Sequence, residues 1–290
     1  MYTSTLITAP QTILETTLVE NLRNAWGGGA VRWLSENHAA EFDMPAVPDN
    51  RWAVWQDLQN MFVDLVVQPT LGRRKKMLLA DMDSTMIEQE CIDELADMAG
   101  VGDRVKVITA RAMNGELDFD SALSERVGLL TGLPVTIIDQ VLHERITYMP
   151  GGKTLLATMK AHGSYAALVS GGFTAFTEKV AAHLGFDENH ANTLLTNGEH
   201  LSGKVGLPIL GKQAKVDALE RITKKLGISD ADVIAVGDGS NDLGMLHRAG
   251  TGVALHAKPS VAAQCDVRIN HGDLSALLYI QGYYQAEFAA

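Results

Sequence analysis

Acidic residues stand in pairs at two points of this chain where a short apolar run ends. Asp81 and Asp83 directly follow the first run, and Asp238 and Asp242 follow the second. Two carboxylates one residue apart can divide a reaction between them, since one can attack an electrophile while the other transfers protons.

A third apolar run ends in a small polar turn, Ser170-Gly171-Gly172. The carboxyl ends of parallel strands meet at one edge of an open α/β sheet, and such sheets bind their ligands there. The three strand ends therefore predict a single site that combines carboxylates with small polar groups.

This combination suits the hydrolysis of a phosphomonoester, which needs an in-line nucleophile, neutralised phosphoryl oxygens and a proton for the leaving group. Asp81 is the natural nucleophile and would form an aspartyl-phosphate intermediate. Because a carboxylate repels a phosphate dianion, a cation must lie between them, and Mg²⁺ prefers such hard oxygen ligands. We expect Asp81 and Asp238 as side-chain ligands, with Asp242 ligating directly or through water. Asp83 would contribute its backbone carbonyl, which leaves its side chain free as general acid and base.

The elements that must position these residues follow an α/β pattern from about residue 76 to the C-terminus. Apolar strands alternate with amphipathic helices, which predicts a doubly wound parallel sheet with a Rossmann-like core. The expected strands are 77–80, 166–169, 233–236, 252–255 and 267–269, and the expected helices are 175–184, 212–226 and 243–249. The sequence Thr196-Asn197-Gly198-Glu199 predicts a hairpin with a type I′ turn.

Residues 87–148 interrupt this alternation. Four helical patterns follow one another there, at 92–99, 105–114, 119–130 and 135–145. A helical cap inserted directly after the first strand end would lie over the crevice. It either adds helical packing or acts as a lid that excludes water, and its start at the carboxylate pair favours the lid.

Residues 1–70 form a second predicted domain, a small α+β domain of unknown role, beside the domain 76–290 that holds the site. No catalytic motif is visible in this N-terminal segment. Residues 68–76 have the composition of a linker, and we expect the basic residues that end it to be solvated. The separateness of the N-terminal domain motivates the hypothesis that it senses an amino acid or mediates a homodimer.

The composition of the 290 residues, 46% hydrophobic and 20% charged, is typical of a soluble globular protein. The net charge of −11 argues against nucleic acid as a partner, although a bound cation would still allow a small phosphorylated substrate. No apolar run approaches the roughly 20 residues needed to span a membrane, and no secretion signal is visible. We therefore expect a cytoplasmic protein whose two cysteines are reduced.

The motifs occur together in the order typical of a known family. Asp81-Met82-Asp83-Ser84-Thr85, the Ser170-Gly171-Gly172 turn, a helical Lys215 and residues 237–242 resemble the four motifs of the haloacid dehalogenase-like phosphatases. More narrowly, residues 81–90, 125–130 and 169–173 resemble the phosphoserine phosphatases of that family. The resemblance covers about residues 76–285, and the N-terminal segment resembles only a poorly characterised extension of some bacterial members.

For the four aspartates the resemblance implies the roles just given. It further implies that Ser170 and Gly171 bind the phosphoryl oxygens, by a hydroxyl and a backbone N–H. Lys215 would neutralise charge on the same group and orient the nucleophile, and Asn241 would hold substrate or nucleophile by hydrogen bonds. Lys212 is an alternative to Lys215, because it lies one turn away on the same helix face.

Selectivity for phosphoserine needs one cation and one anion in the pocket, since this substrate carries a carboxylate and an ammonium besides its phosphate. The resemblance implies that Arg126 clamps the carboxylate and that Glu90 meets the ammonium, while Met113 and Phe119 form an apolar lid. Without the resemblance, we would interpret Glu90 as an acid in the first turn of a helix and Arg126 as a surface partner of Glu125. Met113 and Phe119 would then be core residues of helices.

The function implied by the resemblance is Mg²⁺-dependent hydrolysis of O-phospho-L-serine to L-serine and phosphate, the last step of L-serine biosynthesis. Two alternatives stay open. The protein could act on another small phosphomonoester, or it could be an idle relative whose N-terminal domain binds a ligand or partner. The intact carboxylates argue against the second.

Overall fold

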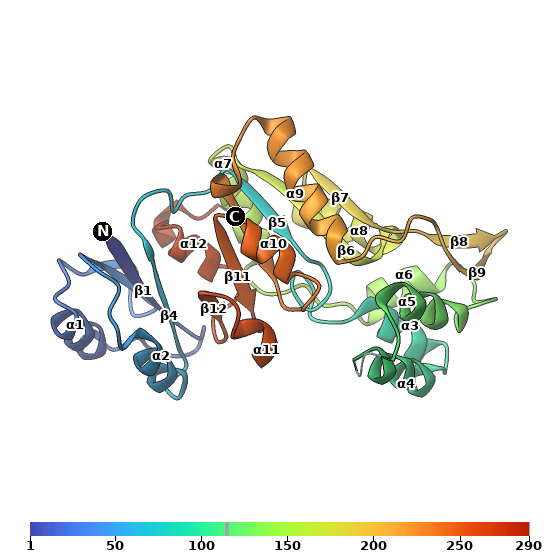
Figure 1. Cartoon of the computed structure of the whole chain (residues 1–290), viewed down its shortest axis with the longest axis horizontal. Helices are drawn as coiled ribbons and strands as arrows, with labels where there is room; N and C mark the ends of the chain where they lie inside the picture. The colour runs from blue at the N-terminus through green and yellow to red at the C-terminus, as the bar shows by residue number, and fades with distance from the viewer. Residues whose placement is uncertain (114–115, 290) are drawn as a thin grey trace.

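A six-stranded parallel sheet forms the centre of the molecule (Figure 1). The computed structural model describes residues 1–113 and 116–289 and, of Met113, the backbone. In spatial order the strands are β12 (Val267–Ile269), β11 (Thr251–Leu255), β10 (Val233–Gly237), β5 (Met77–Ala80), β6 (Tyr165–Phe173) and β7 (Glu188–Asn192). The central strands are nearly continuous apolar runs, as expected of a sheet that is covered on both faces.

Helices cover both faces of this sheet, so the predicted doubly wound architecture is confirmed (Figure 1). One face packs against α7 (Gly152–Ala161), α8 (Thr174–Leu184) and α12 (Ala276–Ile280). The other face packs against α9 (Lys212–Leu226) and α10 (Leu243–Arg248), and the short α11 (Pro259–Ala262) follows β11.

Strand β5 is the point where the chain order of the sheet reverses. It pairs with β6 on one side and with β10 on the other, all in parallel. The loops after these three strands therefore leave the sheet in one crevice. The loops after β5 and β10 carry the carboxylate pairs. Ser170–Gly172 do not form the predicted turn but lie in the last part of β6, where its pairing with β7 is irregular between Val169 and Phe173.

Four helices form an insertion between β5 and α7, namely α3 (Cys91–Met98), α4 (Gly102–Met113), α5 (Phe119–Gly128) and α6 (Ile137–Glu144). An antiparallel bridge between Ile87 and Tyr148 joins the two chain segments that lead into and out of it. The hydrogen bond from Glu88 N to Thr147 O, 3.0 Å long, lies beside that bridge. The insertion thus meets the sheet through a narrow two-stranded neck.

The hairpin of β8 (Leu194–Asn197) and β9 (His200–Val205) extends from the sheet alongside α5 and α6 of this insertion (Figure 1). Leu201 accepts a 2.8 Å hydrogen bond from Gly132 N and donates one of 2.8 Å to Leu133 O. The hairpin was predicted, but its turn is not type I′. Asn197 pairs with His200, and of the two residues between them Gly198 alone has a positive φ, which is the pattern of a type II′ turn.

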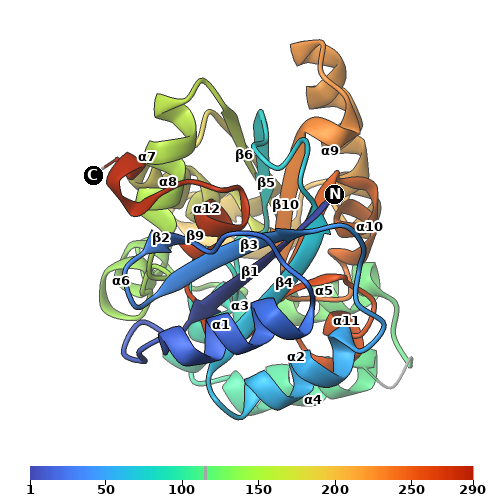
Figure 2. The same ribbon diagram turned by 90° about the vertical axis from the view of Figure 1, so that its left-hand side faces the viewer.

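The N-terminal segment forms a four-stranded antiparallel sheet, which confirms the predicted α+β character. Its strands are β2 (Arg32–Ser35), β3 (Ala39–Met44), β1 (Tyr2–Thr8) and β4 (Val63–Pro69), in that spatial order, with α1 (Thr16–Ala25) and α2 (Arg51–Gln59) on one face (Figure 2). Leu6 packs toward those helices, whereas Ile7 and Val66 pack on the other side with Tyr279 of α12. This N-terminal sheet is therefore sandwiched between its own helices and the rest of the molecule.

The prediction that the basic residues before β5 are solvated holds for Arg74 and Lys76, which are exposed, but is wrong for Arg73 and Lys75. Arg73 forms a 2.6 Å ion pair with Glu41, which is 3% exposed, and the Lys75 side chain is buried. The Lys75 ammonium donates a 2.8 Å hydrogen bond to Ala231 O. Composition alone indicated a linker, but these side chains join the N-terminal sheet to the parallel sheet.

Both cysteines are buried and unbridged, as predicted. Within residues 1–113 and 116–289, no helix combines the length and the apolar character that crossing a membrane requires.

Candidate active site

Three of the predicted carboxylates form a cluster at the ends of β5 and β10. Oxygen atoms of Asp81, Asp238 and Asp242 lie within 4.8 Å of one another. Burial, and then the charge of Asp242, raise the pKa of Asp81 well above its usual value. Burial and the charges of Asp242 and Glu90 likewise raise the pKa of Asp238 to about 6. The cluster therefore holds more negative charge than it can stabilise alone, and its hard oxygen donors fit a divalent cation such as Mg²⁺.

Lys215 is the cation that the fold places in this cluster. Its ammonium lies 2.7 Å from Asp81 Oδ1 and also contacts Asp242 Oδ1, and the side chain is 1% exposed. Burial opposes its charge, but the two carboxylates outweigh burial and raise its pKa. Lys212 is exposed, so the structure favours Lys215 over the alternative.

Besides contacting Lys215, Asp242 holds the loop that follows β10. Its second oxygen accepts a 2.9 Å hydrogen bond from Gly239 N. A Cβ at Gly237 would lie 2.5 Å from this carboxylate, so the close approach requires glycine. Both oxygens of Asp242 already have partners, which favours a supporting role for this residue over direct ligation.

Asp83 lies beside the cluster with its own set of partners. Its carboxylate accepts hydrogen bonds from Cys91 N at 2.9 Å and from Ser170 Oγ at 3.3 Å. Burial, and then the charge of Glu90, raise its pKa to about 7. A carboxyl group with such a pKa can both donate and accept a proton near neutral pH.

The Ser170–Gly172 segment at the end of β6 is held by a residue that the sequence did not reveal. Asn192, 2% exposed at the end of β7, donates hydrogen bonds to Gly171 O at 2.9 Å and Leu210 O at 3.2 Å. Its side-chain oxygen accepts one from Leu210 N at 2.7 Å. Asn192 thus joins this end of β6 to the segment that leads into α9 and Lys215.

A cavity of about 460 Å³ lies between this crevice and the insertion. The predicted site residues that line it are Asp81, Asp83, Glu90, Phe119, Arg126, Ser170, Gly171, Asp238 and Asn241. Phe119 covers Gly171 so closely that a Cβ there would lie 3.2 Å from the ring. The Met113 side chain lies outside the described part of the chain.

Glu90 and Arg126 are the charged residues of the insertion side that the sequence singled out. Glu90 accepts a 2.8 Å hydrogen bond from Ser84 Oγ and makes no capping bond to α3, so the helix-acid alternative is not supported. Glu125 pairs with Arg111 at 2.9 Å instead of with Arg126, so the surface-pair alternative is wrong. Arg126 has no ion pair among the described residues, and burial lowers its pKa although Asp93, Glu90 and Asp83 oppose that shift.

Thr85 is a further site residue to which the sequence gave no role. Its side chain is fully buried and donates a 3.2 Å hydrogen bond to Asp238 Oδ1. The sequence did indicate that Thr85 belongs to the site, because this residue ends the motif that begins at Asp81. Lys258 also lines the cavity, and no motif pointed to it.

Known proteins resemble this chain in sequence and in fold. The family of haloacid dehalogenase-like hydrolases matches residues 78–247. A phosphoserine phosphatase of Archaeoglobus fulgidus is 42% identical over 224 residues, which are 77% of this chain and 65% of that protein, so the chain spans about two thirds of that relative.

Two solved structures show how far the likeness extends. The crystal structure of a HAD-family hydrolase from Salmonella enterica subsp. enterica serovar Typhi has a TM-score of 0.88 and 30% identity, covering 97% of this chain and 99% of that chain. A phospho-aspartyl intermediate analogue of phosphoserine phosphatase has a TM-score of 0.66 and 40% identity, covering 71% of this chain and 98% of that chain. The first likeness includes the N-terminal sheet.

Proposed function

The chain belongs to the haloacid dehalogenase-like hydrolase family, and we propose that within it the protein hydrolyses O-phospho-L-serine to L-serine and phosphate. The assignment of this substrate rests on two charged residues on the insertion side of the cavity. Arg126 has no carboxylate partner among the described residues, and Glu90 lines the same cavity. These charges complement the carboxylate and the ammonium of phosphoserine. The named phosphoserine phosphatases among the relatives support the same substrate.

The reaction follows from the side chains on the floor of the cavity. Asp81 attacks the phosphorus atom, the bond to the seryl oxygen breaks, and an aspartyl-phosphate forms. Asp83 gives its proton to the leaving seryl oxygen, then takes one from the water that releases phosphate. Ser170 and the Gly171 N–H bind the phosphoryl oxygens, and the Lys215 ammonium opposes the rise in the pKa of Asp81, which favours its ionised form. Phe119 helps to exclude water, in keeping with a lid role for the insertion.

Mg²⁺ fits the carboxylate cluster, with Asp81 and Asp238 as side-chain ligands and the Asp83 carbonyl as the third protein ligand. When bound, it would offset the repulsion between Asp81 and the phosphate dianion. A place in L-serine biosynthesis, a cytoplasmic location and a homodimer stay predictions.

A phosphate-release assay tests the function directly. The full chain is offered a panel of phosphorylated metabolites, each with Mg²⁺ and with a chelator. We expect phosphoserine to give the highest kcat/KM, and we expect the chelator and an Asp81→Asn variant to abolish release. An intact circular dichroism spectrum of the variant shows that its fold survives. Higher kcat/KM on another phosphomonoester would contradict the substrate, and release by Asp81→Asn at the wild-type rate would contradict the mechanism.

A further inference from the structure

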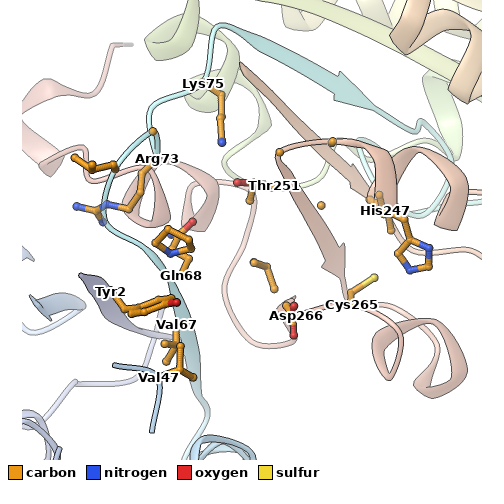
Figure 3. Close-up of a pocket in the computed structure, with 18 of the residues that line it drawn as sticks. Tyr2, Val47, Val67, Gln68, Arg73, Lys75, His247, Thr251, Cys265 and Asp266 are labelled. Carbon is orange, nitrogen blue, oxygen red and sulfur yellow. The ribbon is translucent and has the colours of Figure 1, made fainter. Parts of the chain in front are cut away.

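A second cavity, of about 440 Å³, lies between the N-terminal sheet and the parallel sheet (Figure 3). Its walls include Thr251 and Val267, which begin β11 and β12. The catalytic carboxylates follow the carboxyl ends of the strands, so this cavity lies at the opposite edge of the parallel sheet. We call it the amino-edge cavity. Its volume falls within the range of small-molecule sites.

Basic side chains dominate the charge of this cavity although the chain carries a net charge of −11. Arg51, Arg73 and Lys75 line it, and among the lining residues Asp266 alone is acidic. Arg51 pairs with Asp266 at 2.8 Å, and Arg73 pairs with Glu41 at 2.6 Å. The charges of both arginines are therefore already balanced, whereas that of Lys75 is not.

Lys75 is the buried cation that needs a partner. The residue is 8% exposed, and its ammonium donates to Ala231 O at 2.8 Å, a neutral acceptor. In the described part of the chain no carboxylate forms an ion pair with it, and burial lowers its pKa although Asp232 opposes that shift. Figure 3 shows the Lys75 side chain pointing toward the space between Gln68 and Thr251. A buried ammonium with one carbonyl partner is incompletely compensated.

We propose that the amino-edge cavity binds a small oxyanion, the carboxylate or phosphate group of a metabolite, through the ammonium of Lys75. The anion would supply the countercharge that Lys75 lacks. The hydroxyl groups of Tyr2 and Thr251, which also line the cavity, can bind further oxygens of the ligand. This site is separate from the catalytic cavity, so it can be filled while substrate is bound.

Two probes test the site in the full-length protein, namely malonate for a carboxylate ligand and inorganic phosphate for a phosphate ligand. Backbone amide NMR shifts are followed at Gln68, Thr251 and Gly252, which line the cavity. We expect at least one probe to shift these signals saturably, with a Kd below about 20 mM. Phosphate should also shift the signals of the Ser170–Gly172 segment, so its binding in the catalytic cavity can be distinguished from its binding here. If neither probe shifts the cavity signals, the proposal is overturned.

Two neighbouring lysines give a matched comparison. Lys75→Met removes the buried ammonium and should weaken binding by about tenfold or more, since a charge-assisted bond is lost. Lys76→Met should leave Kd unchanged, because Lys76 is 65% exposed and pairs with Asp232. Equal weakening in both variants would contradict a specific role for Lys75.

A substitution of Asp266 should strengthen anion binding instead of weakening it, and it does not disturb the interior. Its side chain is 75% exposed, so Asp266→Asn should fold normally even if Lys75→Met does not. Removing this negative charge at the rim should tighten anion binding by about two- to fivefold, and more at low salt. Binding that is unchanged or weaker in Asp266→Asn would overturn the proposal.

Discussion

Lys215 shows how a single buried cation determines the arrangement of the candidate site. It contacts Asp81 and Asp242 together, so these two carboxylates can approach each other despite their like charge. With Asp238 included, three carboxylates face one ammonium, and the remaining negative charge leaves a role for a metal ion. The same lysine is therefore both a structural partner of the cluster and a reason to expect Mg²⁺.

Arg126→Ala should separate binding of the substrate carboxylate from phosphate chemistry. The loss of a charge-assisted contact worth about 2 kcal/mol should lower kcat/KM for phosphoserine by roughly 30-fold or more. Turnover of p-nitrophenyl phosphate, which has no carboxylate, should change by less than about threefold. Steady-state kinetics on both substrates measure the difference.

Arg111→Ala is the control for that variant, because Arg111 lies on the same insertion and pairs with Glu125. We expect wild-type kinetics from it on both substrates. An equal loss on both substrates in Arg126→Ala would refute the role in carboxylate recognition.

Asn192→Ala should affect all substrates alike. It leaves Gly171 O and both backbone groups of Leu210 without their partners, so the Ser170–Gly172 segment, which we propose binds phosphate, loses its connection to α9. We expect kcat to fall by about 10- to 100-fold on phosphoserine and on p-nitrophenyl phosphate, as when a supporting contact is lost. Asn189→Ala on the same strand removes the partner of Thr177 and should leave kcat near wild type, with a smaller loss of stability because one hydrogen bond is lost instead of three. A loss of stability without a loss of kcat in Asn192→Ala would make Asn192 merely structural.

At the scale of elements, α9 connects the site to the edge of the sheet. Its buried face carries Lys215, and its outer face carries Arg221 and Lys225, which pair with Glu188 of β7 at 2.7 and 3.2 Å. Burial opposes ionisation of Glu188, but hydrogen bonds from Arg221, His190 and other neighbours outweigh it and lower the pKa to about 2. This cluster of charges holds an edge strand that has little apolar sequence of its own.

Glu188→Gln should therefore destabilise the protein in a way that depends on pH. Because the pKa of Glu188 is about 2 when folded and 4.5 when unfolded, the stabilisation is present above pH 4.5 and is lost as pH falls toward 2. The shift corresponds to at most about 3 kcal/mol, and exposure of Arg221 and Lys225 reduces it to about 1–2 kcal/mol. Urea unfolding at pH 7 and pH 4 should show a smaller difference between variant and wild type at pH 4. Glu178→Gln, on the exposed surface of α8, serves as the control. A larger stability difference between Glu188→Gln and wild type at pH 4 than at pH 7 would contradict the predicted direction of the pH dependence.

The sequence predicted elements where apolar periodicity carried the signal. Strand β5, strand β12 and helix α9 begin and end where expected, since each is bounded by clear changes of pattern. Strand β7 was missed because its sequence, Glu-Asn-His-Ala-Asn, is polar and lies at the edge of the sheet. Likewise Asn192 could not be found, because its partners Gly171 and Leu210 are neighbours only in the folded chain.

At the scale of the whole molecule, the N-terminal sheet is joined to the parallel sheet by buried polar contacts as well as by apolar packing. Asp64 of β4 is fully buried, and its carboxylate accepts hydrogen bonds from Asn270 N, His271 N and Gly272 N at 2.9, 3.0 and 2.7 Å. These three amides follow β12 of the parallel sheet. Such a contact should make the two sheets unfold together.

Asp64→Ala should uncouple the two sheets, because it leaves one buried and two partly buried N–H groups unpaired, at a cost of about 3 kcal/mol. All four tryptophans lie in the N-terminal segment, at Trp26, Trp33, Trp52 and Trp55, so their fluorescence reports that sheet selectively. In urea, fluorescence and phosphatase activity should be lost in one coincident transition in the wild type. In Asp64→Ala the fluorescence change should come first, at lower urea, whereas Asp57→Ala on exposed α2 should behave as wild type. Coincident transitions in Asp64→Ala would show that the sheets stay coupled without the Asp64 hydrogen bonds.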